Sequence, residues 1–172
     1  MDQGYRVLGF VVIAMLYATV GLLAAAGTIF ISRKVFSPKA EQIFYAMFLI
    51  LVAMFYLAFA AYFGAAHAWP LETTAVLAFV LMGLMGARLP FVLIIGYSLH
   101  GVWDLLHEFQ AHGAWSPFEP GQITAIPLAY GIFCLAFDVC VAAYCYTRRQ
   151  EWTAAWRKAL PVAAIGNRKA AV

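Results

Sequence analysis

Long stretches of this chain contain no charged side chain, and this feature limits the available folds more than any other. No Asp, Glu, Lys or Arg lies between Arg6 and Arg33, and none lies between Glu41 and Glu72. Only 11% of all residues are charged and 65% are hydrophobic, whereas a soluble domain has about 25% charged residues. A soluble fold of 172 residues cannot bury this much apolar surface, so the chain is predicted to lie in a lipid bilayer.

The length of the apolar stretches predicts helices rather than the strands of a barrel. Barrel strands are segments of roughly ten residues that alternate in polarity, whereas these stretches are continuous and approach the roughly 20 residues that a spanning helix needs. We therefore predict an all-α fold, an integral membrane bundle of five transmembrane helices with a short amphipathic C-terminal helix. The first span is expected to be retained, because no clear signal-peptide cleavage site follows it. The predicted spans are Val7–Ile31, Ile43–Ala66, Pro70–Ala87, Phe91–Phe109 and Ile123–Tyr146.

The basic residues predict how the bundle is oriented. They fall in the first and third loops and in the tail, whereas only Arg6 lies on the other side. Because basic loops stay in the cytoplasm, we predict an outer N-terminus and a cytoplasmic C-terminus. The chain then divides into a transmembrane domain, residues 1–147, and a basic amphipathic cytoplasmic tail, residues 148–172. The basic residues on the predicted inner side are Arg33, Lys34, Lys39, Arg88, Arg148, Arg149, Arg157, Lys158, Arg168 and Lys169.

The tail carries an amphipathic pattern. Trp152, Trp156 and Leu160 stand at i, i+4 and i+8, and basic residues flank them. This spacing predicts a short helix that lies on the inner leaflet. A helix that docks on a partner protein is the alternative.

Ionisable residues gather in the predicted fourth span and in the loop after it. His100, Asp104 and His107 stand at i, i+4 and i+7, so they share one face of a helix. Asp138 lies well inside the predicted fifth span, where a carboxylate is costly unless it is protonated, paired or hydrated. Imidazole and carboxylate groups bind zinc, iron and manganese. We therefore predict that these four residues bind a divalent metal near the outer face, with Asp104 and Glu108 as candidate catalytic bases.

Three further residues are predicted to contact a substrate. Trp103 borders the face that carries the ionisable residues of the fourth span. Tyr130 and Cys134 share a face with Asp138 at i, i+4 and i+8 of the fifth span. The odd number of cysteines in one apolar run argues against a disulfide framework.

Two other interpretations of the histidine cluster stay open. Without a metal, Asp104 could orient His100 or His107 as an acid, a base or a proton relay. The same residues could instead join two helices through a hydrogen bond worth about 1 kcal/mol. His67 and His112 lie on the same predicted outer side, and each is expected to be a solvated loop residue rather than a ligand.

Three motifs stand between about Gly86 and Tyr144, namely LHGVWDLLHE, PFEP and FCLAFDVCVAAY. Together they resemble the pattern of a family of small bacterial integral membrane proteins of unknown function. The resemblance implies that the cluster is one unit and that Asp138 belongs to it. A second histidine, often present in that family, is replaced here by Glu108. The residues that match the pattern are His100, Trp103, Asp104, His107, Pro117, Phe118, Pro120 and Asp138.

The predicted function follows from the metal site. We expect a multi-pass protein of the bacterial cytoplasmic (inner) membrane that binds zinc, iron or manganese. If the site is catalytic, it hydrolyses or oxidises a lipid-like substrate that enters laterally between helices. The alternative is a non-catalytic small subunit of a larger membrane complex, and a transporter fits less well because no internal repeat is visible.

The expected partners are the lipid bilayer, an apolar or lipid-like ligand, and a membrane-protein partner or a second copy of the chain. Nothing in the sequence indicates nucleic-acid binding, because the basic residues follow the predicted topology rather than a patch.

Overall fold

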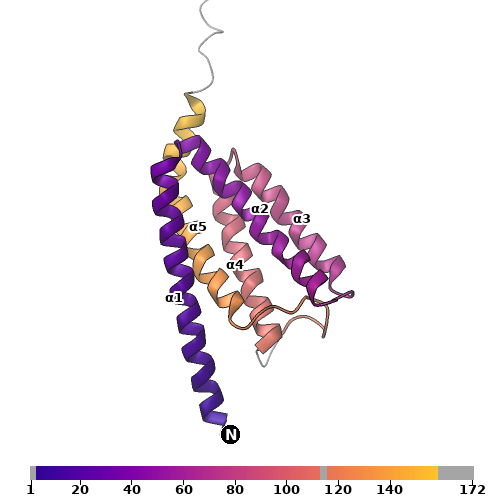
Figure 1. Cartoon of the computed structure of the whole chain (residues 1–172). Coiled ribbons are helices and arrows are strands. Elements are labelled where there is room, and N and C mark those ends of the chain that lie inside the picture. The colour runs from indigo at the N-terminus through magenta and orange to yellow at the C-terminus, as the bar shows by residue number, and fades with distance from the viewer. Residues whose placement is uncertain (1–2, 113–115, 159–172) are drawn as a thin grey trace, which may run out of the picture.

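The computed structural model describes residues 3–112 and 116–158, without the side chains of residues 3–6 and 112. This part of the chain is all-helical and contains no strand, which confirms the predicted fold class (Figure 1). Leu160, Arg168 and Lys169 of the predicted tail lie outside it. The helices are α1 (Gln3–Val35), α2 (Pro38–Tyr62), α3 (Trp69–Gly86), α4 (Pro90–His112) and α5 (Tyr130–Arg157).

Four of these helices, α1, α2, α3 and α5, are long and apolar enough to cross a membrane. The chain is therefore a multi-pass membrane protein, but the prediction of five spans is wrong, because α4 does not meet this criterion. Its polarity comes from four buried side chains, those of His100, Asp104, His107 and Glu108. The side of α4 that faces away from the other helices is apolar, with Phe91, Ile95, Leu99, Val102 and Phe109 exposed.

The predicted fifth helix has different bounds in the structure. It begins at Tyr130 rather than Ile123, because residues 116–129 form turns and irregular backbone that include Pro127. Proline lacks an N–H and disfavours helix at the residue before it. At its other end, α5 continues without a break to Arg157. The start of the predicted amphipathic tail is thus a continuation of α5 and not a separate helix.

The end of α5 packs on the start of α2. Trp152 is fully buried, and its Nε1 donates to Oε2 of Glu41 at 2.9 Å. Nε1 of Trp156 donates to Oε1 of Gln42 at 3.0 Å. Both indoles therefore contact this chain's own α2, because buried Glu41 and Gln42 offer them acceptors.

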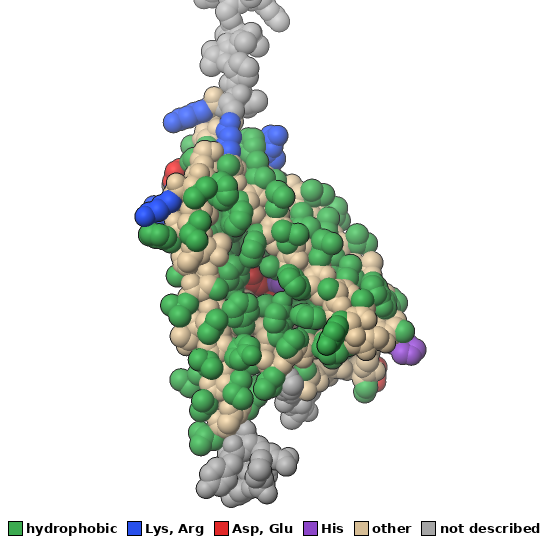
Figure 2. Space-filling view, in the orientation of Figure 1, with side chains coloured by type: hydrophobic (Ala, Val, Ile, Leu, Met, Phe, Trp, Pro, Cys, Tyr) green, Lys and Arg blue, Asp and Glu red, His purple; other side chains and the backbone are tan. Residues whose placement is uncertain are grey.

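The basic residues gather at one end of the bundle, as Figure 2 shows. Lys39 Nζ and the Arg88 guanidinium lie 5.1 and 4.1 Å from the ring centroid of Trp156. The Arg148 guanidinium pairs with Glu41, with Nη2 at 2.8 Å from Oε2. These contacts bring together the start of α2, the α3–α4 connection and the end of α5.

Helix α1 packs mainly against α5 and diverges from α2 beyond their short connection (Figure 1). Gly21 makes the α1–α5 contact possible, because a Cβ there would overlap the carbonyl oxygen of Phe133. Gly83 has the same role between α3 and α2, since its Cβ would lie 2.5 Å from Cγ1 of Ile50. Small residues allow membrane helices to approach closely.

Candidate functional site

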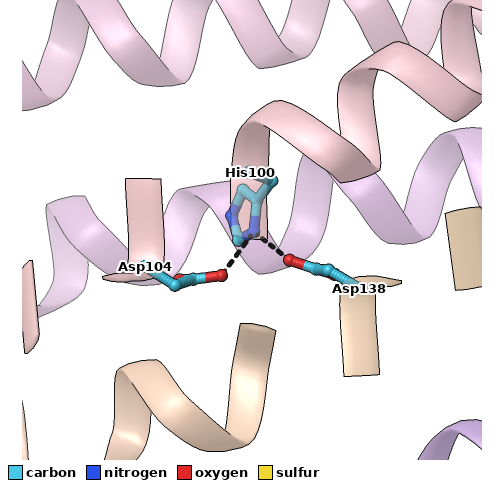
Figure 3. A group of neighbouring side chains, drawn as sticks. All are labelled: His100, Asp104 and Asp138. Carbon is cyan, nitrogen blue, oxygen red and sulfur yellow. Dashed lines mark hydrogen bonds and ion pairs between the residues drawn. The ribbon is translucent and has the colours of Figure 1, made fainter. Parts of the chain in front are cut away.

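His100, Asp104 and Asp138 come together between α4 and α5, and we call them the trio (Figure 3). Nδ1 of His100 lies 2.7 Å from Oδ2 of Asp138 and 3.1 Å from Oδ2 of Asp104. All three residues are buried, with exposed fractions of 0–2%. One potential ligand atom from each lies within 4.8 Å of the other two.

The local sequence explains why the trio forms. The i, i+4 spacing places His100 and Asp104 on one face of α4. Gly101 lets α5 approach that face, since a Cβ at this position would lie 3.3 Å from Cβ of Asp138 and 3.2 Å from Cδ1 of Leu135. The prediction that Asp138 needs a polar partner is consistent with this contact.

The hydrogen bonding of the trio is incomplete. The single hydrogen on Nδ1 of His100 cannot serve two carboxylates, and the shorter contact, to Asp138, is the hydrogen bond. The Tyr56 hydroxyl donates to Oδ1 of Asp104, but Oδ2 of Asp104 has no hydrogen bond. Nε2 of His100 also has none. Because buried polar atoms are nearly always hydrogen bonded, these two atoms have capacity for another group.

The charge of the trio is also unbalanced. Two carboxylates face one imidazole, and among the described residues the ion pairs of both carboxylates involve only His100. A protonated imidazole can balance one carboxylate and not both. Burying an uncompensated charge is costly, so the second carboxylate requires either a shared proton or a bound cation.

His107, the fourth predicted ligand, has other partners. Its Nδ1 donates to the carbonyl oxygen of Trp103 at 2.9 Å, and its Nε2 lies 2.8 Å from Oε1 of Glu72. Since Nδ1 faces a carbonyl, it carries a hydrogen, and a further proton is shared between Nε2 and Glu72. The backbone N–H of Thr124 also donates to Oε1 of Glu72, at 2.7 Å. Both ring nitrogens of His107 are thus occupied by the protein.

Sequence reasoning missed two residues of this region, Glu72 and Tyr56. Both are fully buried or nearly so. The Tyr56 ring lies 4.2 Å from the His107 ring and its hydroxyl reaches Asp104, so it links His107 to the trio. Glu72 stands in the first turn of an otherwise apolar helix, and this position could have indicated from the sequence that its side chain is buried. Tyr56 had no such signal among the many aromatic residues of α2.

Glu108, predicted as a catalytic base, holds the start of α5. Oε1 accepts the backbone N–H of Ala129 and Oε2 accepts that of Gly131, each at 3.1 Å. The first N–H groups of a helix lack intrahelical acceptors, and a carboxylate there also interacts favourably with the helix dipole. Glu108 therefore caps α5 from α4.

Replacing Glu108 by alanine is expected to lower the free energy of unfolding by about 0.5–2 kcal/mol, the usual effect of losing a helix cap. Denaturant titration in mild detergent, followed by circular dichroism, measures this. Glu119→Ala is the matched control, because Glu119 is an exposed carboxylate in the segment before α5. Equal effects of the two substitutions would contradict the capping role.

A cavity of about 380 Å³ lies beside the trio, between α1, α2 and α5. His100 and Asp138 form part of its lining, and so do the predicted substrate contacts Tyr130 and Cys134. Figure 2 shows a hollow among hydrophobic side chains in which acidic and histidine side chains are visible. The apolar lining includes Ala24, Phe48, Val52, Phe55, Phe133 and Phe137.

Trp103 and His67, also singled out from the sequence, are not among the described residues that line this cavity. The Trp103 ring packs against His107 and Phe118, at centroid distances of 5.1 and 5.7 Å. His67 is exposed in the turn between α2 and α3. The side chain of His112 lies outside the described residues. The three cysteines, Cys134, Cys140 and Cys145, are free thiols.

Comparison with known proteins identifies a family. No curated protein and no solved structure matches the chain. One family model matches residues 15–151, a longer stretch than the 86–144 on which the sequence resemblance rests. This stretch contains the whole trio and all the described residues that line the cavity. Its description is a family of unknown function, DUF6010. Because the match covers most of the sequence, the chain belongs to the DUF6010 family.

Proposed function

We propose that the protein binds a divalent metal ion at the trio of His100, Asp104 and Asp138. The observation that supports this most is the unbalanced charge of a buried site, in which two carboxylates face one imidazole. A divalent cation would balance both carboxylates, and Oδ2 of Asp104, which now accepts no hydrogen bond, would be one of its ligands. Imidazole nitrogen and carboxylate oxygen are suitable ligands for zinc, iron or manganese.

The proposed ligand set leaves out His107, because both of its ring nitrogens have protein partners. Three protein ligands with further open positions are the usual arrangement of a catalytic zinc site. The Tyr56 hydroxyl holds Oδ1 of Asp104, so Oδ2 is the oxygen that remains to bind a metal or to accept a proton. Outer partners of this kind orient metal ligands.

We propose hydrolysis or oxidation of a lipid-like substrate as the reaction, with the cavity beside the trio as its binding site. A bound metal supplies activation of water or oxygen. Asp104 would hold the metal through Oδ2 with its Oδ1 fixed by Tyr56, so it orients the site rather than acting as the base, and Glu108 keeps its carboxylate on the start of α5. The lining of the cavity is mostly apolar, with a few polar groups, so it suits a substrate with one reactive group on an apolar body. These polar groups include those of His100, Asp138, Thr28 and Tyr130.

We further propose that the basic end of the bundle faces the cytoplasm of a bacterial inner membrane. The support is the clustering of Lys and Arg side chains at that end. His100 follows Pro90 by ten residues, so it lies about 15 Å along α4 from the basic end. In a hydrocarbon core about 30 Å thick, the trio would lie near the middle.

Elemental analysis of the protein purified in mild detergent tests the metal site. We expect about one zinc, iron or manganese per chain in the wild type, as three ligands hold a single ion. His100→Gln and Asp138→Asn are expected to lose the metal. His107→Gln, which changes the same residue type on the same helix, is expected to retain it.

Circular dichroism of each variant shows whether it is folded. A folded wild type that contains no metal, and that takes up none of the three ions when they are added, would rule out the proposal. Loss of metal in His107→Gln with retention in His100→Gln would show that the ligands have been assigned to the wrong histidine.

A further inference from the structure

We infer that the cavity beside the trio binds a neutral lipid that carries a hydroxyl group, such as a long-chain alcohol. This inference rests on the proposed function, because it names the substrate class of the same site. Its support comes from the access to the cavity, from the apolar lining and from the charge and hydrogen-bonding capacity of the polar lining.

Access to the cavity is from the side of the bundle. Its lining comes from α1, through Ala24 and Thr28, and from α2, through Phe48, Val52 and Phe55. These two helices diverge, and the hollow between them is surrounded by hydrophobic side chains (Figures 1 and 2). Because both helices are apolar enough to span a membrane, this side faces lipid. A ligand dissolved in the bilayer can therefore enter without passing through water.

The size and lining of the cavity suit an apolar body. Its volume of about 380 Å³ lies within the range of roughly 300–1,000 Å³ that small-molecule sites have. Phe48, Phe55, Phe133 and Phe137 provide large apolar contact areas.

The charge of the lining disfavours an anionic headgroup. The cavity is lined by Asp138 and His100, with Asp104 in contact with His100, whereas no Lys or Arg is among its described lining residues. A phosphate or carboxylate would lose water here without gaining a cationic side chain as its partner, which is costly. A bound divalent metal would only cancel the charge of the two aspartates, so it would leave no net positive charge to attract an anion.

The hydrogen-bonding capacity of the trio favours a hydroxyl group. Nε2 of His100 is buried without a partner, and it is an acceptor in one protonation state of the ring and a donor in the other. A hydroxyl can both donate and accept, so it can pair with Nε2 in either state. An ammonium group can only donate and a carbonyl oxygen can only accept. A hydroxyl oxygen can also occupy an open position on a metal.

Photo-crosslinking in lipid nanodiscs tests the inference. The probe is dodecanol with a diazirine on its chain, and mass spectrometry of the digested protein locates the labelled peptides. Labelling is expected in the parts of α1, α2 and α5 that line the cavity. Unlabelled dodecanol is expected to compete at a concentration roughly tenfold or more below that of dodecyl phosphate, because burying an anion without a cationic partner costs several kcal/mol.

A pair of neighbouring substitutions controls for position. Val52→Trp fills the cavity without changing the trio, whereas Leu51→Trp adds the same side chain on the lipid-facing side, where Leu51 is 56% exposed. We expect Val52→Trp to lose most of the labelling and Leu51→Trp to retain it. The metal content of both variants is expected to equal that of the wild type.

The outcomes separate the inference from the proposed function. Equal competition by dodecanol and dodecyl phosphate, or full labelling of Val52→Trp, would overturn the inference even if the metal is present. Specific labelling of a protein that holds no metal would support the ligand class and overturn the metal site.

Discussion

Replacing Glu41 by alanine is expected to lower the free energy of unfolding by about 3–5 kcal/mol, the usual effect of removing one partner of a buried ion pair. Glu41 is fully buried and accepts hydrogen bonds from Nε and Nη2 of Arg148 at 3.1 and 2.8 Å. Nε1 of Trp152 and the Tyr144 hydroxyl donate to the same carboxylate. Alanine would leave these donors without their acceptor, which is costly for the buried ones.

The effect is expected at the lower end of that range, because the Arg148 side chain is 15% exposed and can turn toward water. Titration with a denaturing detergent in mixed micelles, followed by circular dichroism, measures the change. Glu151→Ala is the control, since Glu151 pairs with the same Arg148 but has a side chain that is 53% exposed. Its loss is expected to be about 0–1 kcal/mol. If both substitutions have equal effects, the buried contact is not what stabilises this end of the bundle.

Replacing Gly21 by alanine is expected to lower the free energy of unfolding by about 1–3 kcal/mol, as overpacking in a tight contact does. A methyl group at this position would overlap the carbonyl oxygen of Phe133 and would lie 3.2 Å from Cβ of Ala136. Backbone atoms cannot rotate away, so α1 would have to move off α5. Because α1 forms one wall of the cavity through Ala24 and Thr28, the same substitution is expected to weaken labelling by the dodecanol probe.

Gly27→Ala on the same helix is expected to raise the free energy of unfolding instead of lowering it. No atom lies within 4 Å of a Cβ built at Gly27, and alanine in a helix interior is favoured over glycine by about 0.5–1 kcal/mol. Unfolding titrations of the two single variants under identical conditions provide the comparison. Stabilisation by both substitutions would show that α1 does not pack closely on α5 at Gly21.

Much of the fold follows from local sequence. The charge-free stretches predict α1, α2 and α3 to within a few residues, because continuous apolar sequence of this length has few alternatives in lipid. The start of α5 was placed too early, since Ile123 and Ile126 are buried in irregular backbone rather than in a helix. Hydrophobicity alone does not distinguish a buried turn from a helix.

The candidate site was only partly predictable. Helical spacing placed His100 and Asp104 together, and the burial cost of a carboxylate indicated that Asp138 needs a partner. The same spacing grouped His107 with them, but one turn further along α4 the neighbour is Glu72 of α3 rather than α5. Contacts between helices depend on how the helices cross, which the spacing within one helix does not specify.

The polarity of α4 has a consequence for biosynthesis. Burying the four ionisable side chains His100, Asp104, His107 and Glu108 of α4 in lipid has a high cost unless those side chains find partners. Two of these partners come from preceding helices, namely Tyr56 for Asp104 and Glu72 for His107. The other two come from α5, namely Asp138 for His100 and the backbone at the start of α5 for Glu108. Since α5 is translated after α4, α4 lacks part of this compensation until α5 arrives. We therefore expect α4 to reach its place in the bundle only when α5 is present to complete the trio.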